Sequence, residues 1–216
     1  MSVMKKSVLP RLAAALFALQ AALLFFTLFN LLSFLLDCPV SLFLAILLLL
    51  RKRGAPLAIA AALLAAAQLL YAGVLANLPS FLPLWWAAMG PYLAGSALLL
   101  ALVLVNTVPK LKRLRVWANP LWFLPGGVML LAAAGNWAYY VYLGMTPLLA
   151  LQALDSLGCG ALKAAGVLLL SWWLVSCAQE DLIPYQQMLG SLLTEEQLEE
   201  KRREMGLAGR PRRGSN

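Results

Sequence analysis

The chain has 216 residues, of which 62% are hydrophobic and 12% are charged, and its formal net charge is +8. Soluble domains are about 45–50% apolar and about 25% charged, so this composition excludes an ordinary soluble domain and is typical of a polytopic membrane protein. The chain contains three cysteines and no histidine. It therefore lacks the commonest general base and metal ligand, and its cysteine spacing indicates neither a disulfide framework nor a zinc motif.

The N-terminal region begins with basic residues and continues as an apolar run, which is also how a signal peptide begins. The apolar part of a signal peptide is about 7–15 residues long and ends at a small-residue cleavage site. Here the run continues to Leu36 without such a site. We therefore expect a retained first span.

A membrane-spanning helix needs about 20 apolar residues. The region between Arg11 and Arg51 has about 40 residues, or roughly 60 Å of helix, which is two membrane thicknesses. It forms either two short spans with a tight turn at residues 30–39, or one long helix followed by an apolar piece that does not span. Four later segments are clear spans: residues 56–77, 84–106, 120–143 and a stretch that contains Lys163 and ends near Cys177.

The basic residues decide between five and six spans, because cytoplasmic loops are enriched in lysine and arginine. With six spans, every lysine and arginine except Lys163 lies on the cytoplasmic side. We therefore predict an all-α bundle of six transmembrane helices in the cell inner membrane, with both termini cytoplasmic. The predicted spans are residues 11–30, 34–50, 56–77, 84–106, 120–143 and 157–177, and residues 179–216 form a cytoplasmic tail.

Three prolines, Pro39, Pro91 and Pro125, lie in the predicted spans or at their ends. This pattern is typical either of ordinary kinks in a packed bundle or of broken helices that line a binding site. The last outer loop, residues 144–157, is the longest and is predicted to contain an interfacial helical turn.

Lys163 is a single charge inside the last predicted span. Small residues share its helix face, which indicates that it points at a neighbouring helix and not at lipid. An intramembrane charge is a candidate ligand or ion site, and the alternatives are a structural ion pair or a lysine that snorkels toward the outer surface. Its candidate partners are Asp37, in the predicted first outer turn, and Asp155, which alternatively caps the last helix. The small residues that share the helix face of Lys163 are Ser156, Cys159, Gly160, Gly166 and Val167.

Other polar residues in the spans either line a cavity or hydrogen-bond across helices. Cys38 and Cys159 both fall near the outer end, where they either form a disulfide or pack as small apolar residues. The polar residues in the predicted spans that either line a cavity or hydrogen-bond across helices are Gln20, Asn30, Gln68, Ser96 and Asn136.

The tail sequence "TEEQLEEKRREMG" predicts a short helix that Thr194 and Gln197 begin as a capping box. Its apolar stripe is too narrow to fold alone and needs a partner. Residues 188–207 resemble the short C-terminal domain (SHOCT) family, and this resemblance implies a small helical hairpin that mediates oligomerisation or contact with a membrane partner. The candidate contact residues are Leu192, Leu193, Leu198 and Met205.

The end of the tail, "GRPRRGSN", is basic and is expected to attract anionic lipid, whereas it has no aromatic residues of the kind that stack on nucleic acid. We expect no nucleic-acid partner.

No serine-nucleophile motif, metal cluster or nucleotide-binding loop occurs in the sequence, so we expect a non-enzymatic protein without a cofactor. The first functional hypothesis is an integral inner-membrane protein whose tail mediates self-association or partner association. The alternative is a small-solute transport subunit with an outward-facing pocket near Lys163. For this alternative, the predicted size, the six spans and the "RLAAALFALQAALLF" start resemble the substrate-binding components of energy-coupling-factor transporters.

Overall fold

The computed structural model describes residues 3–27, 31–76, 82–142 and 147–180, and this part of the chain is helical without a β-strand. A short connection between α4 and α6 contains the 3₁₀ helices η1 (Pro109–Leu114) and η2 (Asn119–Leu121) on either side of α5 (Arg115–Ala118). The long helices are α1 (Val3–Thr27), α2 (Leu31–Leu49), α3 (Ala55–Ala76), α4 (Leu82–Thr107), α6 (Leu124–Tyr142) and α7 (Pro147–Glu180).

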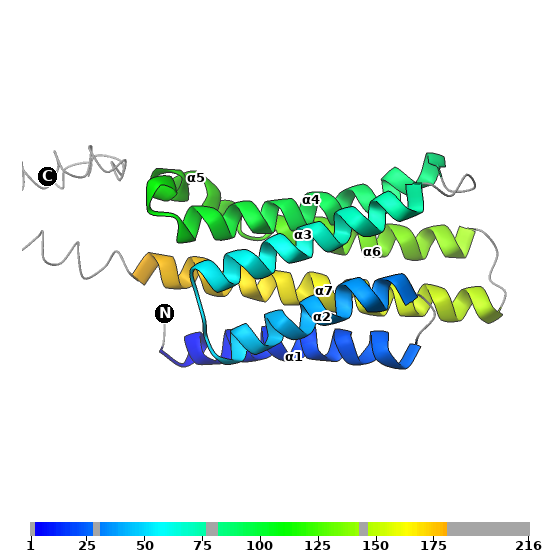
Figure 1. Cartoon of the computed structure of the whole chain (residues 1–216), viewed down its shortest axis with the longest axis horizontal. Coiled ribbons are helices and arrows are strands. Elements are labelled where there is room, and N and C mark those ends of the chain that lie inside the picture. Colours follow the sequence, from blue (N-terminus) through cyan, green and yellow to red (C-terminus); the bar gives the residue numbers. More distant parts are fainter. Residues whose placement is uncertain (1–2, 28–30, 77–81, 143–146, 181–216) are drawn as a thin grey trace, which may run out of the picture.

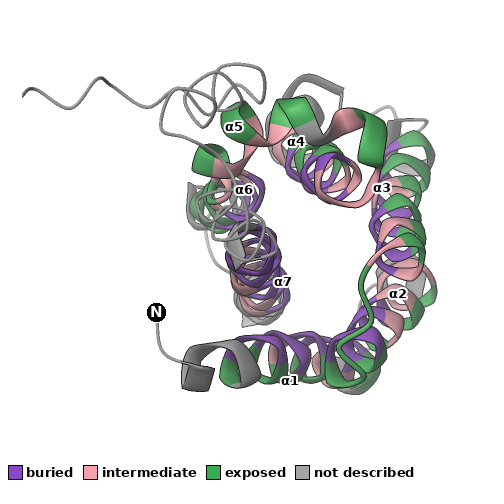
Figure 2. Ribbon diagram, turned by 90° about the vertical axis from the view of Figure 1, so that its left-hand side faces the viewer, coloured by how far each residue is buried: buried purple, intermediate pink, exposed green. Residues whose placement is uncertain are grey.

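The long helices lie side by side and alternate in direction (Figure 1). The start of α1, the α2–α3 connection, α5 and the end of α7 all lie at one end of the bundle. Seen along the bundle, the helices form a ring in the order α1, α2, α3, α4, α6, α7, and α7 closes the ring between α6 and α1 (Figure 2). Helices that follow one another in the sequence are therefore also neighbours in space.

Buried residues face the inside of the ring and exposed residues face outward (Figure 2). The inward residues include many alanines and leucines, which pack closely between helices. Much of the outward surface is made of large apolar side chains, as expected for a surface that contacts lipid. Examples of these exposed side chains are Leu12, Leu19, Leu42, Ile46, Ile59 and Leu63.

Within the part of the chain that the structure describes, five segments are long and apolar enough to cross a membrane. A shorter apolar helix, Phe34–Leu49, lies in α2. The expectation of an all-helical membrane protein is therefore confirmed at this level. The five segments are Val8–Phe25, Ala55–Gly73, Gly90–Thr107, Arg115–Gly135 and Leu157–Ala178.

The predicted turn at residues 30–39 is wrong over most of its length, because α2 begins at Leu31 and Pro39 lies inside it. Membrane helices tolerate an internal proline where neighbouring groups satisfy the backbone that it leaves unpaired. Asp37 is therefore a helix residue and not a turn residue. Pro91 likewise lies inside α4, whereas Pro125 is the second residue of α6, where the missing N–H breaks no helical hydrogen bond.

The helical turn expected in the last outer loop, residues 144–157, is the start of α7, which runs without interruption from Pro147 through Glu180, so the last helix begins ten residues before the predicted span. A proline at the first position of a helix has a favourable φ angle and leaves no donor unpaired. Asp155 therefore lies inside α7 and is not the cap of a helix that begins at residue 157, and its side chain lies outside the described part of the structure.

At the end of the bundle that contains the α2–α3 connection, two helices end in specific hydrogen bonds. Arg51 has a φ of 52°, and the N–H groups of Arg51 and Lys52 donate to the carbonyls of Leu48 and Leu47. This is the Schellman pattern that ends α2. At the end of α4, the Arg115 guanidinium donates to the carbonyl of Val105 at 3.2 Å and to that of Asn106 at 2.6 Å.

Candidate intramembrane polar site

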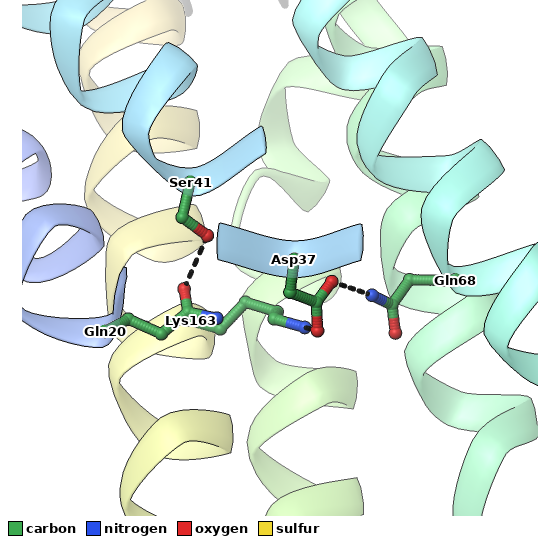
Figure 3. Close-up of polar contacts among 5 residues, drawn as sticks. All are labelled: Gln20, Asp37, Ser41, Gln68 and Lys163. Carbon is green, nitrogen blue, oxygen red and sulfur yellow. Dashed lines mark hydrogen bonds and ion pairs between the residues drawn. The ribbon is translucent and has the colours of Figure 1, made fainter. Parts of the chain in front are cut away.

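Lys163 on α7 forms a buried ion pair with Asp37 on α2. Its Nζ lies 2.6 Å from Oδ2 of Asp37, and the two side chains are only 6% and 13% exposed. The lysine side chain extends across the ring toward the carboxylate (Figure 3). Of the two candidate partners, the structure brings Asp37 to the lysine. Lys163 is thus paired with a charge inside the bundle.

Gln68 on α3 holds the other oxygen of the same carboxylate. Its Nε2 donates to Oδ1 of Asp37 at 2.7 Å, so both carboxylate oxygens accept a hydrogen bond (Figure 3). The lysine Nζ also lies 5.7 Å from the centroid of the Tyr92 ring on α4, within the range of a cation–π interaction. The charge pair is therefore held by four helices.

Gln20 on α1 adds a polar group that is only half satisfied. The Ser41 hydroxyl donates to its Oε1 at 3.0 Å, whereas its Nε2 is buried without a hydrogen-bond partner among the described residues. The Gln20 side chain is 0% exposed, and its partner Ser41 lies one helical turn after Asp37 on α2 (Figure 3). Most buried polar groups are paired, so this amide N–H₂ is a donor available to a further molecule.

The charged and amide side chains lie at a common depth. Gln20, Asp37, Gln68 and Lys163 each lie about four residues, or about 6 Å, from the middle of their apolar stretch. In all four helices this displacement is toward the end opposite the α2–α3 connection (Figure 1). The relevant stretches are Val8–Phe25, Phe34–Leu49, Ala55–Gly73 and Leu157–Ala178.

The predicted small-residue face of α7 is confirmed where its side chains are described. Cys159, Gly160, Gly166 and Val167 are buried with Lys163, whereas the opposite residues are partly exposed. A Cβ added to Gly160 would lie 2.3 Å from the Tyr92 hydroxyl oxygen, so the missing side chain allows Tyr92 to approach α7.

Cys38 and Cys159 lie in one small apolar cluster with Ala21 and Leu24. Neither cysteine forms a disulfide in the structure, and the Cys38 thiol lies 3.8 Å from the Ala21 carbonyl oxygen as a weak donor. This agrees with the interpretation as small residues at helix contacts. Within the described residues there is no group of three side chains that could hold a metal ion.

Sequence reasoning named Gln20 and Gln68 as polar span residues but did not connect them with Lys163, and it missed Ser41 and Tyr92. Their common depth, which follows from counting residues within each apolar stretch, could have linked the two glutamines to the ion pair. The tail residues Leu192, Leu193, Leu198 and Met205 lie outside the described residues.

No family model, curated protein or solved structure matches this chain. Among the described residues, the interior of the ring presents the Lys163 ammonium group, the Asp37 carboxylate and the Gln20 amide nitrogen, which has no hydrogen-bond partner there, at one depth and buried in the bundle. Such a set can bind a small polar molecule by ion pairing and hydrogen bonding.

Proposed function

We propose that the chain is a six-span inner-membrane protein with both termini in the cytoplasm. Although α2 has only 19 residues, it would be about 28 Å long, close to the hydrocarbon thickness of a bilayer. The start of α1 and the end of α7 lie at the same end of the bundle as the exposed Arg51, Lys52 and Arg53 (Figure 1). An even number of spans and the positive-inside rule account for both features.

Within this architecture, we propose that the ring interior binds a small polar solute and that the protein acts without enzymatic chemistry, as a transport subunit does. The observation that carries the proposal is the Lys163–Asp37 pair, which lies one helical turn along α2 from the partner of Gln20, Ser41; the Gln20 Nε2 has no hydrogen-bond partner among the described residues. Replacing a buried ion pair by apolar residues is often neutral or stabilising, so helix packing alone does not explain these charges. Ionisable groups inside membrane bundles mark ligand and ion pathways.

Stability measurements on two variants test whether the charges serve function or packing. Lys163→Met leaves Asp37 without its ion-pair partner, and we expect it to lower the free energy of unfolding by about 3–5 kcal/mol. The triple variant Asp37→Val/Gln68→Leu/Lys163→Met removes the linked polar groups together. We expect its stability to lie within about 1 kcal/mol of the parent chain or above it, while any solute-dependent rise in melting temperature is lost.

Thermal unfolding of the purified proteins in one detergent gives the comparison. If the triple variant is as unstable as Lys163→Met, the polar groups are needed for packing, and the proposed solute site is overturned.

A second proposal concerns the tail and rests on its sequence. The apolar stripe of Leu198 and Met205 and the resemblance of residues 188–207 to the SHOCT family favour self-association or association with a membrane partner. The basic residues after it favour contact with anionic lipid. Deleting residues 187–216 should lower the oligomeric mass in detergent, measured by light scattering. An unchanged mass would contradict self-association through the tail.

A further inference from the structure

The charge balance of the site selects the class of solute. In the structure, Lys163 and Asp37 form an ion pair and neutralise each other's charge. A solute that is only an anion would pair with Lys163 and leave Asp37 as an unpaired buried charge, and a solute that is only a cation would do the reverse. An unpaired charge at this depth is strongly unfavourable. A solute that carries both charges leaves neither protein charge unpaired.

We infer that the solute is a small zwitterion, with a carboxylate and an ammonium or quaternary ammonium group in one molecule. This inference rests on the proposed solute-binding function. The zwitterion exchanges one internal ion pair for two: its carboxylate binds Lys163, and its cationic group binds Asp37. No covalent bond changes, and the net charge of the site stays at zero.

The neighbouring residues fit this exchange. Gln68 donates to Oδ1 of Asp37 and therefore holds the carboxylate in place when Oδ2 changes its partner from Lys163 to the solute. The lysine side chain is long and can retreat by rotation of its methylene groups. The Nε2 of Gln20 has no hydrogen-bond partner in the described part of the chain, so it can give the solute carboxylate a second hydrogen bond in addition to that of Lys163.

The same arrangement limits the size of the solute. It enters between two groups whose charged atoms lie 2.6 Å apart in the ion pair, inside a ring whose helices are packed against one another. A few heavy atoms between the two charges are therefore favoured, as in glycine, β-alanine or glycine betaine, over a long or bulky zwitterion.

Thermal unfolding of the purified full chain in nanodiscs tests this inference. The probes are glycine, β-alanine and glycine betaine, compared with acetate as the anion, methylammonium and tetramethylammonium as the cations, and acetamide as the neutral molecule, at matched ionic strength. We expect at least one zwitterion to raise the melting temperature by about 5 °C or more at a concentration about 100-fold above its Kd. The single-charge probes should bind about a hundredfold more weakly.

Variants separate the contacts. Gln20→Leu leaves the ion pair intact and should weaken zwitterion binding by about tenfold, because a hydrogen bond to a charged group is lost. Ser96→Ala is the matched control, since the Ser96 hydroxyl bonds within its own helix to the Leu93 carbonyl, and it should bind like the parent chain. If Gln20→Leu and Ser96→Ala bind the zwitterion equally well, Gln20 does not contact the solute.

The outcomes distinguish this inference from the function on which it rests. If acetate, a cation or acetamide binds as tightly as every zwitterion and its binding is lost in Lys163→Met, the zwitterion inference is overturned and solute binding stands. If none of the zwitterions shifts the melting temperature, the inference is also overturned. The stability of the triple variant then decides separately whether the solute site itself stands.

Discussion

At the scale of single residues, the central feature is that Lys163 is paired and shared among several helices. Asp37 supplies the opposite charge, Gln68 holds the carboxylate, and Tyr92 lies beside the ammonium group. A lysine that only snorkelled to the surface would be expected to expose its charged end, whereas this side chain is 6% exposed. Of the sequence-based alternatives, the structure favours an internal ion pair.

The approach of Tyr92 to Lys163 depends on the missing side chain of Gly160. A Cβ at this position would lie 2.3 Å from the Tyr92 hydroxyl oxygen and 2.9 Å from the Ala133 Cβ. We therefore expect Gly160→Ala to lower the free energy of unfolding by about 1–3 kcal/mol. Gly158→Ala is the control on the same helix, because a Cβ there has no neighbour within 4 Å. Thermal unfolding in detergent measures both, and equal stability of the two variants would contradict this packing account.

At the scale of helices, sequence hydropathy predicted the long elements but not all of their ends. Apolar content indicates that a segment spans the membrane, whereas the end of a helix depends on local backbone contacts. Pro39 was expected in a turn but lies inside α2. The last helix was expected to begin at residue 157, whereas α7 begins at Pro147. The Schellman contacts at Arg51 and Lys52 end α2 at Leu49, near the predicted boundary at residue 50.

The contact between α6 and α7 depends on a glycine. A Cβ on Gly126 would lie 2.4 Å from Cγ of Leu168, 2.7 Å from the Ala164 carbonyl oxygen and 2.9 Å from the Leu168 nitrogen. Two of these atoms are backbone atoms, so the helices would have to separate. We expect Gly126→Ala to lower the free energy of unfolding by about 2–3 kcal/mol.

The adjacent residue is the control for this prediction. A Cβ at Gly127 has no neighbour within 4 Å, so Gly127→Ala should unfold at or above the parent temperature. Loss of stability in Gly127→Ala but not in Gly126→Ala would show that this contact is not arranged as described.

At the scale of the whole molecule, the ring brings together charges that are 126 residues apart in the sequence. Because α7 closes the ring between α6 and α1, its inner face looks across at α2 and α3 (Figure 2). A row of helices in the same order without closure would leave Lys163 far from Asp37. The site is therefore a property of the closed arrangement.

The six-span proposal predicts which loops reach each side of the membrane. In intact cells, a membrane-impermeant maleimide should label Ser80→Cys, between α3 and α4, and should label Lys52→Cys only after the membrane is permeabilised. The parent chain is the control, because its three cysteines are buried. Labelling of Lys52→Cys from outside would contradict the proposed orientation.

Composition and hydropathy along the chain establish that the protein is helical and apolar, where its long apolar segments lie, and how far each polar residue is from the middle of its segment. These properties follow from composition and from the fixed rise of a helix, and both can be counted along the chain. The fold, in contrast, shows which helices are neighbours, and hence that Lys163 pairs with Asp37, that Gln68 donates to the same carboxylate and that Gln20 is bonded to Ser41 one turn away on α2. Hydropathy indicates the position of a residue along the helix axis, whereas its partner across the bundle is selected by side-chain packing and polar pairing between helices.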